Sequence, residues 1–206
     1  GISKQFVKKS IFGSKSSVVK AVDDVTFSLN RGDVLVIAGE SGSGKSTIAK
    51  LILMATSPDS GRIVFEGEEI KTDSKSLKKI RMQCQMVYQD PYDSINPRMK
   101  VGDIVSEPLQ IHNIGNNFER KKMSMEALRE VKLEPAEEIM EKYPHMLSGG
   151  QRQRVVLARA LVLRPKIIIA DEPVSMLDVS IRAEILELMK EIQKKNNISF
   201  IYITHD

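Results

Sequence analysis

A glycine-rich loop that directly follows an apolar run is the feature that most constrains the fold of this chain. Residues Val34–Ala38 are continuously apolar, which is typical of a parallel strand buried on both faces of a sheet. The segment from Ser46 to Met54 has the pattern of a helix. The pattern G-x-x-x-x-G-K-[ST] lies between them, and in this context it predicts a phosphate-binding loop. The loop and the residue after it are Gly39, Glu40, Ser41, Gly42, Ser43, Gly44, Lys45, Ser46 and Thr47.

The residue types of this loop indicate its chemistry. Glycines let the backbone curl so that successive N–H groups point at phosphate oxygens, and the helix N-terminus adds about half a positive charge. We expect Lys45 to reach the β- and γ-phosphates and the Ser46 hydroxyl to bind Mg²⁺. The alternative is a Gly/Ser-rich turn without a ligand. The strand before the loop and the helix after it argue against that alternative.

A second apolar run, from Ile167 to Ala170, ends in the acidic pair Asp171-Glu172. In open α/β sheets, ligands bind at the carboxyl ends of the strands. Asp171 suits the Mg²⁺ shell through water, and Glu172 suits a general base, a role worth roughly 10²–10⁴-fold in rate. Taken alone, the pair could equally be two solvated loop acids. Beside a phosphate loop, we expect both carboxylates to be functional.

A third motif stands at the predicted start of a helix from Ser148 to Leu163. Ser148 and Gln151 have the spacing of a capping box, so the plain interpretation is a well-capped helix. Gly149 and Gly150, however, each cost roughly 1 kcal/mol of helix propensity. Two glycines there make sense if the backbone must come close to another group. Because bare helix N-termini attract phosphate, this turn is a second candidate anion site.

The three motifs, in this order, resemble those of the ATP-binding cassette (ABC) ATPases, and the resemblance covers essentially the whole chain. It implies ATP and Mg²⁺ as ligands. It also implies a head-to-tail dimer in which Ser148, Gly149, Gly150 and Gln151 of one subunit cap the γ-phosphate of the ATP held by the other. Gln89 resembles the glutamine that reaches Mg²⁺ and the attacking water and links the nucleotide to a helical insert. Without the family, Gln89 would be an ordinary loop glutamine.

Three further residues acquire roles from the same resemblance. Asp178 ends Ser175-Met176-Leu177-Asp178, which is similar to the loop that crosses the dimer interface, although the family more often has Ala at the position of Met176. Asp178 could also simply cap the next helix. His205 resembles the histidine that contacts the γ-phosphate and holds Glu172 and water in line. Phe6 is our candidate for stacking on adenine and Phe12 is the second, although either ring could equally belong to the core.

These patterns predict an α/β fold: a P-loop NTPase core with a mainly parallel sheet, an N-terminal antiparallel β layer and an inserted α-helical subdomain. We expect one ABC ATPase domain over residues 1–206, a fragment of a longer protein, with the helical insert at approximately 91–147. The insert is expected to be helical in its second half. The remaining expected elements are the antiparallel layer at 18–30 and 61–70, the strands at 85–88 and 200–204, and helices at 118–133 and 179–195.

Composition limits the compartments and the kinds of partner that are expected for this chain. The net charge of +4 comes from scattered Lys and Arg, which is only weak evidence for a nucleic acid or an anionic surface. No apolar run is long enough for a transmembrane helix, and the polar start of the chain lacks a secretory core. Cys84 is the single cysteine, which excludes a disulfide within the chain and suits a reducing cytosol.

Longer strings are similar to one ABC subfamily, the di- and oligopeptide importer ATPases, which also has nickel and oligosaccharide importers as relatives. The strings are residues 88–99, 101–104, 107–109, 143–145 and 170–175. The resemblance implies ABC membrane subunits as partners, a homodimer or a paralogous ATPase subunit, and indirectly an extracytoplasmic substrate-binding protein. It places the chain peripherally at the cytoplasmic face of the cell membrane, with no nucleic acid. The alternatives are a soluble ABC ATPase acting on DNA or ribosomes, and a polar amino acid or sugar importer ATPase.

Overall fold

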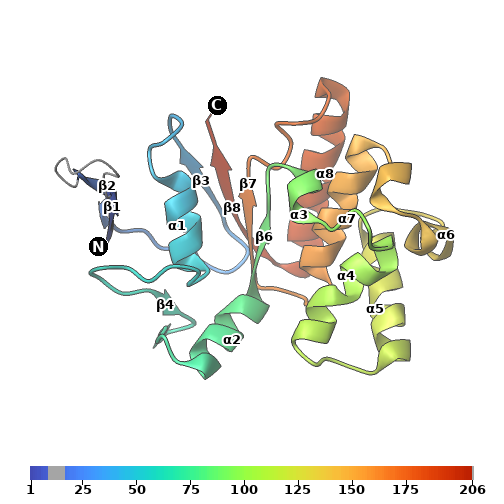
Figure 1. The fold of residues 1–206 in the computed structure, drawn as a ribbon, viewed down its shortest axis with the longest axis horizontal. Helices are drawn as coiled ribbons and strands as arrows, with labels where there is room; N and C mark the ends of the chain where they lie inside the picture. The colour runs from blue at the N-terminus through green and yellow to red at the C-terminus, as the bar shows by residue number, and fades with distance from the viewer. Residues whose placement is uncertain (9–16, 206) are drawn as a thin grey trace.

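A four-stranded parallel sheet forms the centre of the computed structural model, which describes residues 1–8 and 17–205. Its strand order is β3-β8-β7-β6, and each neighbouring pair is parallel. Figure 1 shows α1 on one side of this sheet and α7 and α8 on the other. The elements are β3 (Val34–Ala38), α1 (Lys45–Ile52), β6 (Cys84–Val87), α7 (Gly149–Leu161), β7 (Ile167–Asp171), α8 (Val179–Asn196) and β8 (Ser199–Thr204).

Two apolar clusters explain why the sheet needs helices on both faces. Ile169, Ile201 and Ile203 pack with Ala49 and Ile52 of α1 on one face. On the other face, side chains of β7 and β8 pack against α7 and α8 in the largest cluster, which includes Val156, Ile168, Ile185, Leu188 and Phe200. Burying each such side chain contributes about 1.5–3 kcal/mol. The α/β fold class, the parallel pairing and the burial of β7 and β8 are therefore confirmed. The prediction that Val34–Ala38 is buried on both faces is wrong, because β3 lies at the edge of the sheet, where Val34 and Val36 are exposed.

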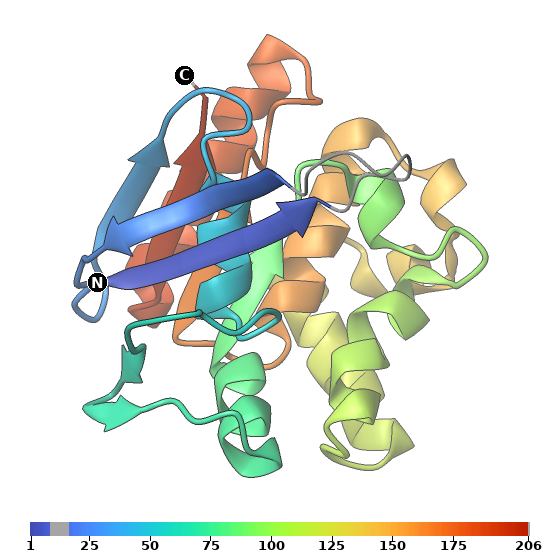
Figure 2. The same ribbon diagram turned by 60° about the vertical axis from the view of Figure 1, so that its left-hand side comes forward.

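The N-terminal antiparallel layer is present, but its pairing differs from the prediction. β1 (Ile2–Lys8) pairs with β2 (Ser17–Val25), so the expected strand at 18–30 ends at Val25. The 61–70 segment instead forms its own small hairpin of β4 (Val64–Phe65) and β5 (Glu68–Glu69). Strand β1 was not expected, because its two lysines and glutamine dilute the apolar alternation on a largely exposed hairpin. Figure 2 shows β1 and β2 crossing in front of α1.

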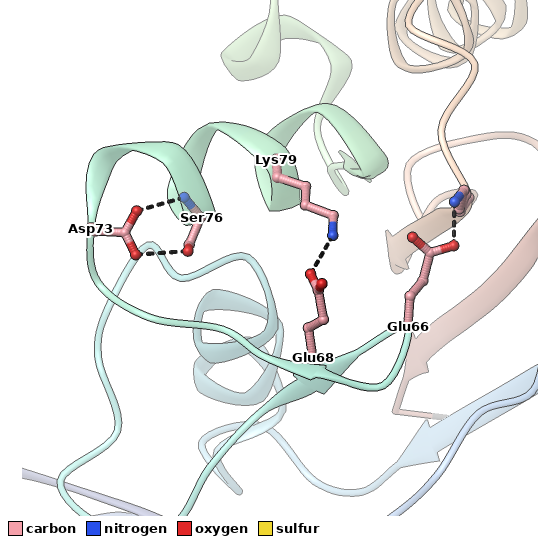
Figure 3. Close-up of polar contacts among 6 residues, drawn as sticks. Glu66, Glu68, Asp73, Ser76 and Lys79 are labelled. Atoms are coloured by element: carbon pink, nitrogen blue, oxygen red, sulfur yellow. Dashed lines mark hydrogen bonds and ion pairs between the residues drawn. The ribbon is translucent and has the colours of Figure 1, made fainter.

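Helix α2 (Ser74–Gln83) was also missed by the sequence analysis. Asp73 is a residue type that commonly caps helices, and its carboxylate accepts hydrogen bonds from the N–H groups of Lys75 and Ser76. Only Ile80 of the helix is buried, so no apolar stripe signals it. Figure 3 shows Lys79 of α2 paired with Glu68, and Asp73 bonded to Ser76. The Lys79–Glu68 distance is 2.6 Å, and Glu66 pairs with Lys166, which directly precedes β7. These exposed contacts orient the small hairpin against α2 and the sheet.

The insert is helical through most of its length, not only in its second half. It consists of α3 (Pro91–Ser94), α4 (Val101–Ile111), α5 (Asn117–Glu130), α6 (Ala136–Glu141) and a short 3₁₀ helix, η1 (Pro144–Met146). Helix α4 was overlooked because it contains Pro108, which lacks the N–H for one helical hydrogen bond and usually indicates a helix break. Val101, Val105 and Leu109 of α4 are fully buried against the α7 side of the molecule. Over the described part of the chain, none of the helices combines the length and the apolar character that a membrane span requires.

Candidate functional site

The parallel strands bring most of the predicted site residues to one edge of the sheet. All four strands run in the same direction, so their carboxyl ends meet there. The phosphate loop follows β3, Asp171 ends β7, and His205 follows β8. Gln89 lies two residues after β6 with an exposed side chain. The turn at Ser148 and the loop residue Asp178 belong to the starts of α7 and α8 instead.

The phosphate loop adopts a conformation that depends on glycine at Gly44. This residue caps α1 with a left-handed φ of 98°, and a Cβ there would lie 2.0 Å from the carbonyl oxygen of Ala21 in β2. Any side chain would therefore force the loop away from the N-terminal hairpin. The buried Lys45 ammonium donates to the carbonyl oxygens of Gly39 and, at 2.8 Å, of Glu40. The Lys45 side chain thus bonds back to its own loop, and its positive charge lies at the N-terminus of α1.

Ser46 and Asp171 place two oxygen ligands side by side. The Ser46 hydroxyl donates to the Asp171 carboxylate at 3.2 Å, joining the start of α1 to the end of β7. Burial raises the pKa of Asp171 above its ordinary value, and the charge of Glu172 acts in the same direction. The hydrogen bond from Ser46 opposes this shift. A cation bound at this position would offset the free-energy cost of keeping the half-buried Asp171 carboxylate charged.

Glu172 and His205 form the second polar contact of the edge. His205 Nδ1 lies 2.7 Å from Glu172 Oε1, and the glutamate is the more buried partner, at 17% side-chain exposure against 50%. The Glu172 N–H donates to the carbonyl oxygen of Ile203 at 2.9 Å, which fixes its main chain to β8. Both residues line a cavity of about 300 Å³ that opens beside the ends of β7 and β8. A carboxylate held by an imidazole at a strand end has the geometry of an oriented base.

The Ser148 turn has both bonds of the predicted capping box. Gln151 N–H donates to Ser148 Oγ at 3.2 Å, and Ser148 N–H donates to Gln151 Oε1 at 3.0 Å. The glycines of the turn have a reason within the chain as well. A Cβ on Gly150 would lie 2.7 Å from Cγ2 of Ile181, whereas one on Gly149 would make an ordinary contact. The two glycines were expected to let the backbone come close to another group. For Gly150, that group is Ile181, so the close approach is between α7 and α8.

The remaining predicted residues occupy distinct places. Asp178 stands at the N-cap position of α8, but its side chain makes no capping hydrogen bond, so helix capping does not account for its carboxylate. Phe6 lies in β1, opposite Val19, and its ring is 44% exposed with the Lys4 ammonium 5.8 Å away. It is not a core residue. Phe12 lies outside the described residues.

Three contacts beside the motifs escaped the sequence analysis. Arg152, next to Gln151, stacks its guanidinium 4.2 Å from the ring centre of Tyr92 and donates to the Leu147 carbonyl at 2.6 Å. The buried Gln153 amide donates to the Pro173 carbonyl at 2.6 Å, which ties α7 to the segment after Glu172. The only signal for these residues is their position beside the motifs, because contacts between distant segments leave no periodic pattern.

Comparisons with known proteins identify the family of the chain. The family model described as ABC transporter matches residues 22–175. Oligopeptide transport ATP-binding protein AppF of Bacillus subtilis is 45% identical over 97% of this chain and 61% of its own length. Dipeptide transport ATP-binding protein DppF of Escherichia coli is 44% identical over 97% of this chain and 59% of its own length. The chain therefore spans less than two thirds of these relatives.

Solved structures share the fold. The structure of cbiO1 from Clostridium perfringens, described as part of the ABC transporter complex cbiONQ, has a TM-score of 0.81 and 31% identity, covering 100% of this chain and 78% of that one. A dimeric post-hydrolysis structure of the ATP-binding cassette MJ0796, bound to ADP and Pi, has a TM-score of 0.81 and 29% identity, covering 100% and 86%. The family model matches most residues of the chain, and the predicted motifs lie on the fold of that family. The chain therefore belongs to the ABC transporter family.

Proposed function

We propose that this chain is the ATP-hydrolysing subunit of an ABC importer of di- or oligopeptides. The observation that carries the proposal is the edge of the sheet, where the phosphate loop, the Ser46–Asp171 contact and the Glu172–His205 contact stand together. The peptide cargo is supported by the printed functions of the two relatives, which are oligopeptide and dipeptide transport.

The residues present fit ATP and Mg²⁺. The first N–H groups of α1 have no partner within the helix, and the Lys45 ammonium is held at the same place, so triphosphate oxygens would find both donors and charge. Mg²⁺ prefers oxygen ligands, and Ser46 Oγ and Asp171 Oδ2 already lie 3.2 Å apart, with Gln89 as the third candidate. When bound, Mg²⁺ would neutralise charge that develops on the phosphates.

The chemistry follows from the residues at this edge. Glu172 accepts the proton of the water that attacks the γ-phosphorus, and His205 holds the Glu172 carboxylate in line and contacts the γ-phosphate. Lys45 exchanges the carbonyl oxygens of Gly39 and Glu40 for phosphate oxygens. Gln89, at the junction with the insert, responds to the nucleotide and passes the change to the helices that follow. Exposed Phe6 provides a face for adenine.

A second chain completes the site in this proposal. Within residues 1–8 and 17–205, no hydrogen bond or ion pair joins the Ser148–Gln151 turn to the phosphate loop. The proposed dimer sets the ATP of a partner subunit against Ser148, Gly149, Gly150 and Gln151. Asp178, whose side chain makes no capping bond, reaches across the interface in this proposal. The partner is either a second copy or a paralogous ATPase subunit.

The family supports the task that we propose for the protein. The ATPase pair acts from the cytoplasmic face of the membrane on two membrane subunits, which receive cargo from an extracytoplasmic substrate-binding protein, and no nucleic acid takes part. The helical insert is the part that would push on the membrane subunits. A cargo of nickel or oligosaccharide would use the same engine. An ATPase acting on DNA or ribosomes is the alternative from another class.

Substituting Glu172 by Gln tests the engine. The amide keeps the shape of the side chain but cannot accept the proton, so we expect phosphate release to fall by about 10²–10⁴-fold while ATP binding is retained. The measurement is steady-state phosphate release beside equilibrium binding of a fluorescent ATP analogue. An exposed acid changed in the same way, Glu187→Gln, is the control. Normal turnover in Glu172→Gln would remove Glu172 as the base.

A pull-down tests the task. The tagged full-length protein is purified from detergent-solubilised native membranes, and its companions are identified by mass spectrometry. Two polytopic membrane subunits with a second ATPase would support an importer, and a co-purifying peptide-binding lipoprotein would support peptides as cargo. Ribosomal or DNA-repair proteins without membrane subunits would contradict the transport assignment.

A further inference from the structure

An arginine on α8 holds the loop that connects Glu172 to Asp178. Arg182 Nε donates to the Leu177 carbonyl oxygen at 2.7 Å, and Arg182 Nη2 donates to the Ser175 carbonyl oxygen at 3.0 Å. The guanidinium is half-buried and lines the cavity of about 300 Å³ that also contains Glu172 and His205. A single side chain thus fixes two carbonyl groups of a segment that has no regular structure of its own.

The loop passes this constraint on to Glu172. Ser175 donates twice to the Glu172 carbonyl oxygen, from its N–H at 3.2 Å and from its hydroxyl at 3.1 Å. Glu172 itself has a φ of 45°, in the left-handed region that residues with a Cβ rarely adopt. Such a conformation persists only where its surroundings determine it. The hydrogen bonds from Arg182 to Ser175 and from Ser175 to Glu172 are part of those surroundings.

The chemistry of arginine suits this position. Its planar guanidinium presents several N–H donors in a fixed fork, so two carbonyls that point toward the same place can be held together. A lysine has one ammonium on a flexible stem and would satisfy one of the two carbonyls well. Near the other end of the loop, Leu177 leads directly to Asp178, whose side chain makes no capping bond. Arg182 therefore acts on both ends of the segment.

We propose that Arg182 is a positioning residue for hydrolysis: by holding the carbonyls of Ser175 and Leu177, it sets the orientation of Glu172 toward the attacking water. The inference rests on the proposed role of Glu172 as the base. Arg182 does not touch the nucleotide in this scheme, so its loss leaves ATP binding unchanged and slows turnover.

The test compares Arg182→Met, Arg182→Lys and the matched control Lys190→Met in the full-length protein. Lys190 lies on the same helix, and its exposed ammonium reaches only Glu187, at 3.3 Å, so its removal tests the loss of a cation from α8. For Arg182→Met, we expect kcat to fall by about 10- to 100-fold, as a displaced catalytic group does. The KM for ATP should stay within about twofold of the wild-type value. Arg182→Lys should recover part of kcat, and Lys190→Met should match the wild type.

Hydrogen exchange of the backbone supplies a readout at the loop itself. Peptides covering residues 172–178 should exchange faster in Arg182→Met than in the wild type or in Lys190→Met, because two fixed carbonyl contacts are lost. If Arg182→Met cannot be purified folded, the same kcat and exchange measurements on Arg182→Lys decide the question. An unchanged kcat, in either variant, with faster exchange or a lower melting temperature would show a role in stability alone and overturn the proposal.

The Glu172→Gln variant separates this proposal from the proposed function. If Glu172→Gln hydrolyses ATP normally, the assignment of the base fails, and with it the reason for positioning Glu172. If Glu172→Gln is inactive while Arg182→Met turns over at the wild-type rate, only the role of Arg182 fails. If both assignments are correct, adding Arg182→Met to Glu172→Gln should lower the residual rate little further, because the group that Arg182 positions is already disabled.

Discussion

Glu172 shows at the scale of one residue how the fold prepares chemistry. Its left-handed φ of 45° costs of order 1–3 kcal/mol, and the structure holds it with main-chain bonds to Ile203 and Ser175. Its carboxylate is then placed 2.7 Å from His205, which directly follows the neighbouring strand β8. The contact between these two side chains follows from the sequence, because both stand at the ends of apolar runs that pair in parallel. The backbone conformation of Glu172 has no such signal.

Cys84 gives a prediction at the same scale. The thiol is 1% exposed in β6, and burial raises its pKa to about 12. Because the thiolate is the reactive form, we expect native protein at pH 8 to react with Ellman's reagent at least about 100-fold more slowly than the same protein unfolded in guanidinium chloride. The absorbance of the released chromophore measures both rates. Complete labelling of the native protein within the mixing time would contradict the burial of Cys84.

The start of α7 shows that the packing of two helices decides which of its two glycines lies close to a side chain. Gly149 and Gly150 are neighbours in one helical turn, yet only Gly150 faces a close side chain, that of Ile181 on α8. The capping box at Ser148 was predictable, since its spacing is local. The closeness of Ile181 was not, because it arises from how two helices pack. The elements β1, α2 and α4 were missed for local reasons: polar residues dilute the pattern of β1, α2 buries only Ile80, and α4 contains Pro108.

Gly150→Ala tests this packing. The added Cβ overpacks against the stiff, β-branched Ile181, a cost of about 1–3 kcal/mol, which exceeds the roughly 1 kcal/mol that Ala gains over Gly in a helix. We expect a lower free energy of unfolding in urea for Gly150→Ala and none lost for Gly149→Ala, the control. In an Ile181→Ala background, Gly150→Ala should be stabilising instead. Equal stabilities of the two glycine variants in the Ile181 protein would refute the close approach.

In the whole molecule, the helical insert and α7 are joined by a salt bridge and by a shared apolar cluster. Arg159 of α7 pairs with Glu107 of α4 at 2.7 Å and also donates to the Ser94 carbonyl at 3.5 Å. The largest apolar cluster runs through α4, α5, α7 and α8 without interruption. We therefore expect a displacement of the insert to carry the Ser148 turn with it. This arrangement would connect the response proposed for Gln89 to the surface that would meet the partner's ATP.

Sedimentation velocity of Glu172→Gln, with and without Mg²⁺-ATP, tests the proposed ATP site between two chains. The variant is run alone and mixed with any second ATPase recovered in the membrane pull-down. We expect ATP to convert monomer to dimer, because ATP retained between two chains joins them. We also expect Ser148→Arg, added to Glu172→Gln, to abolish the dimer while ATP still binds the monomer. Two results would contradict the head-to-tail site. One is a monomer at every ATP concentration, both for the variant alone and for its mixture with the second ATPase; the other is a dimer that persists with Ser148→Arg.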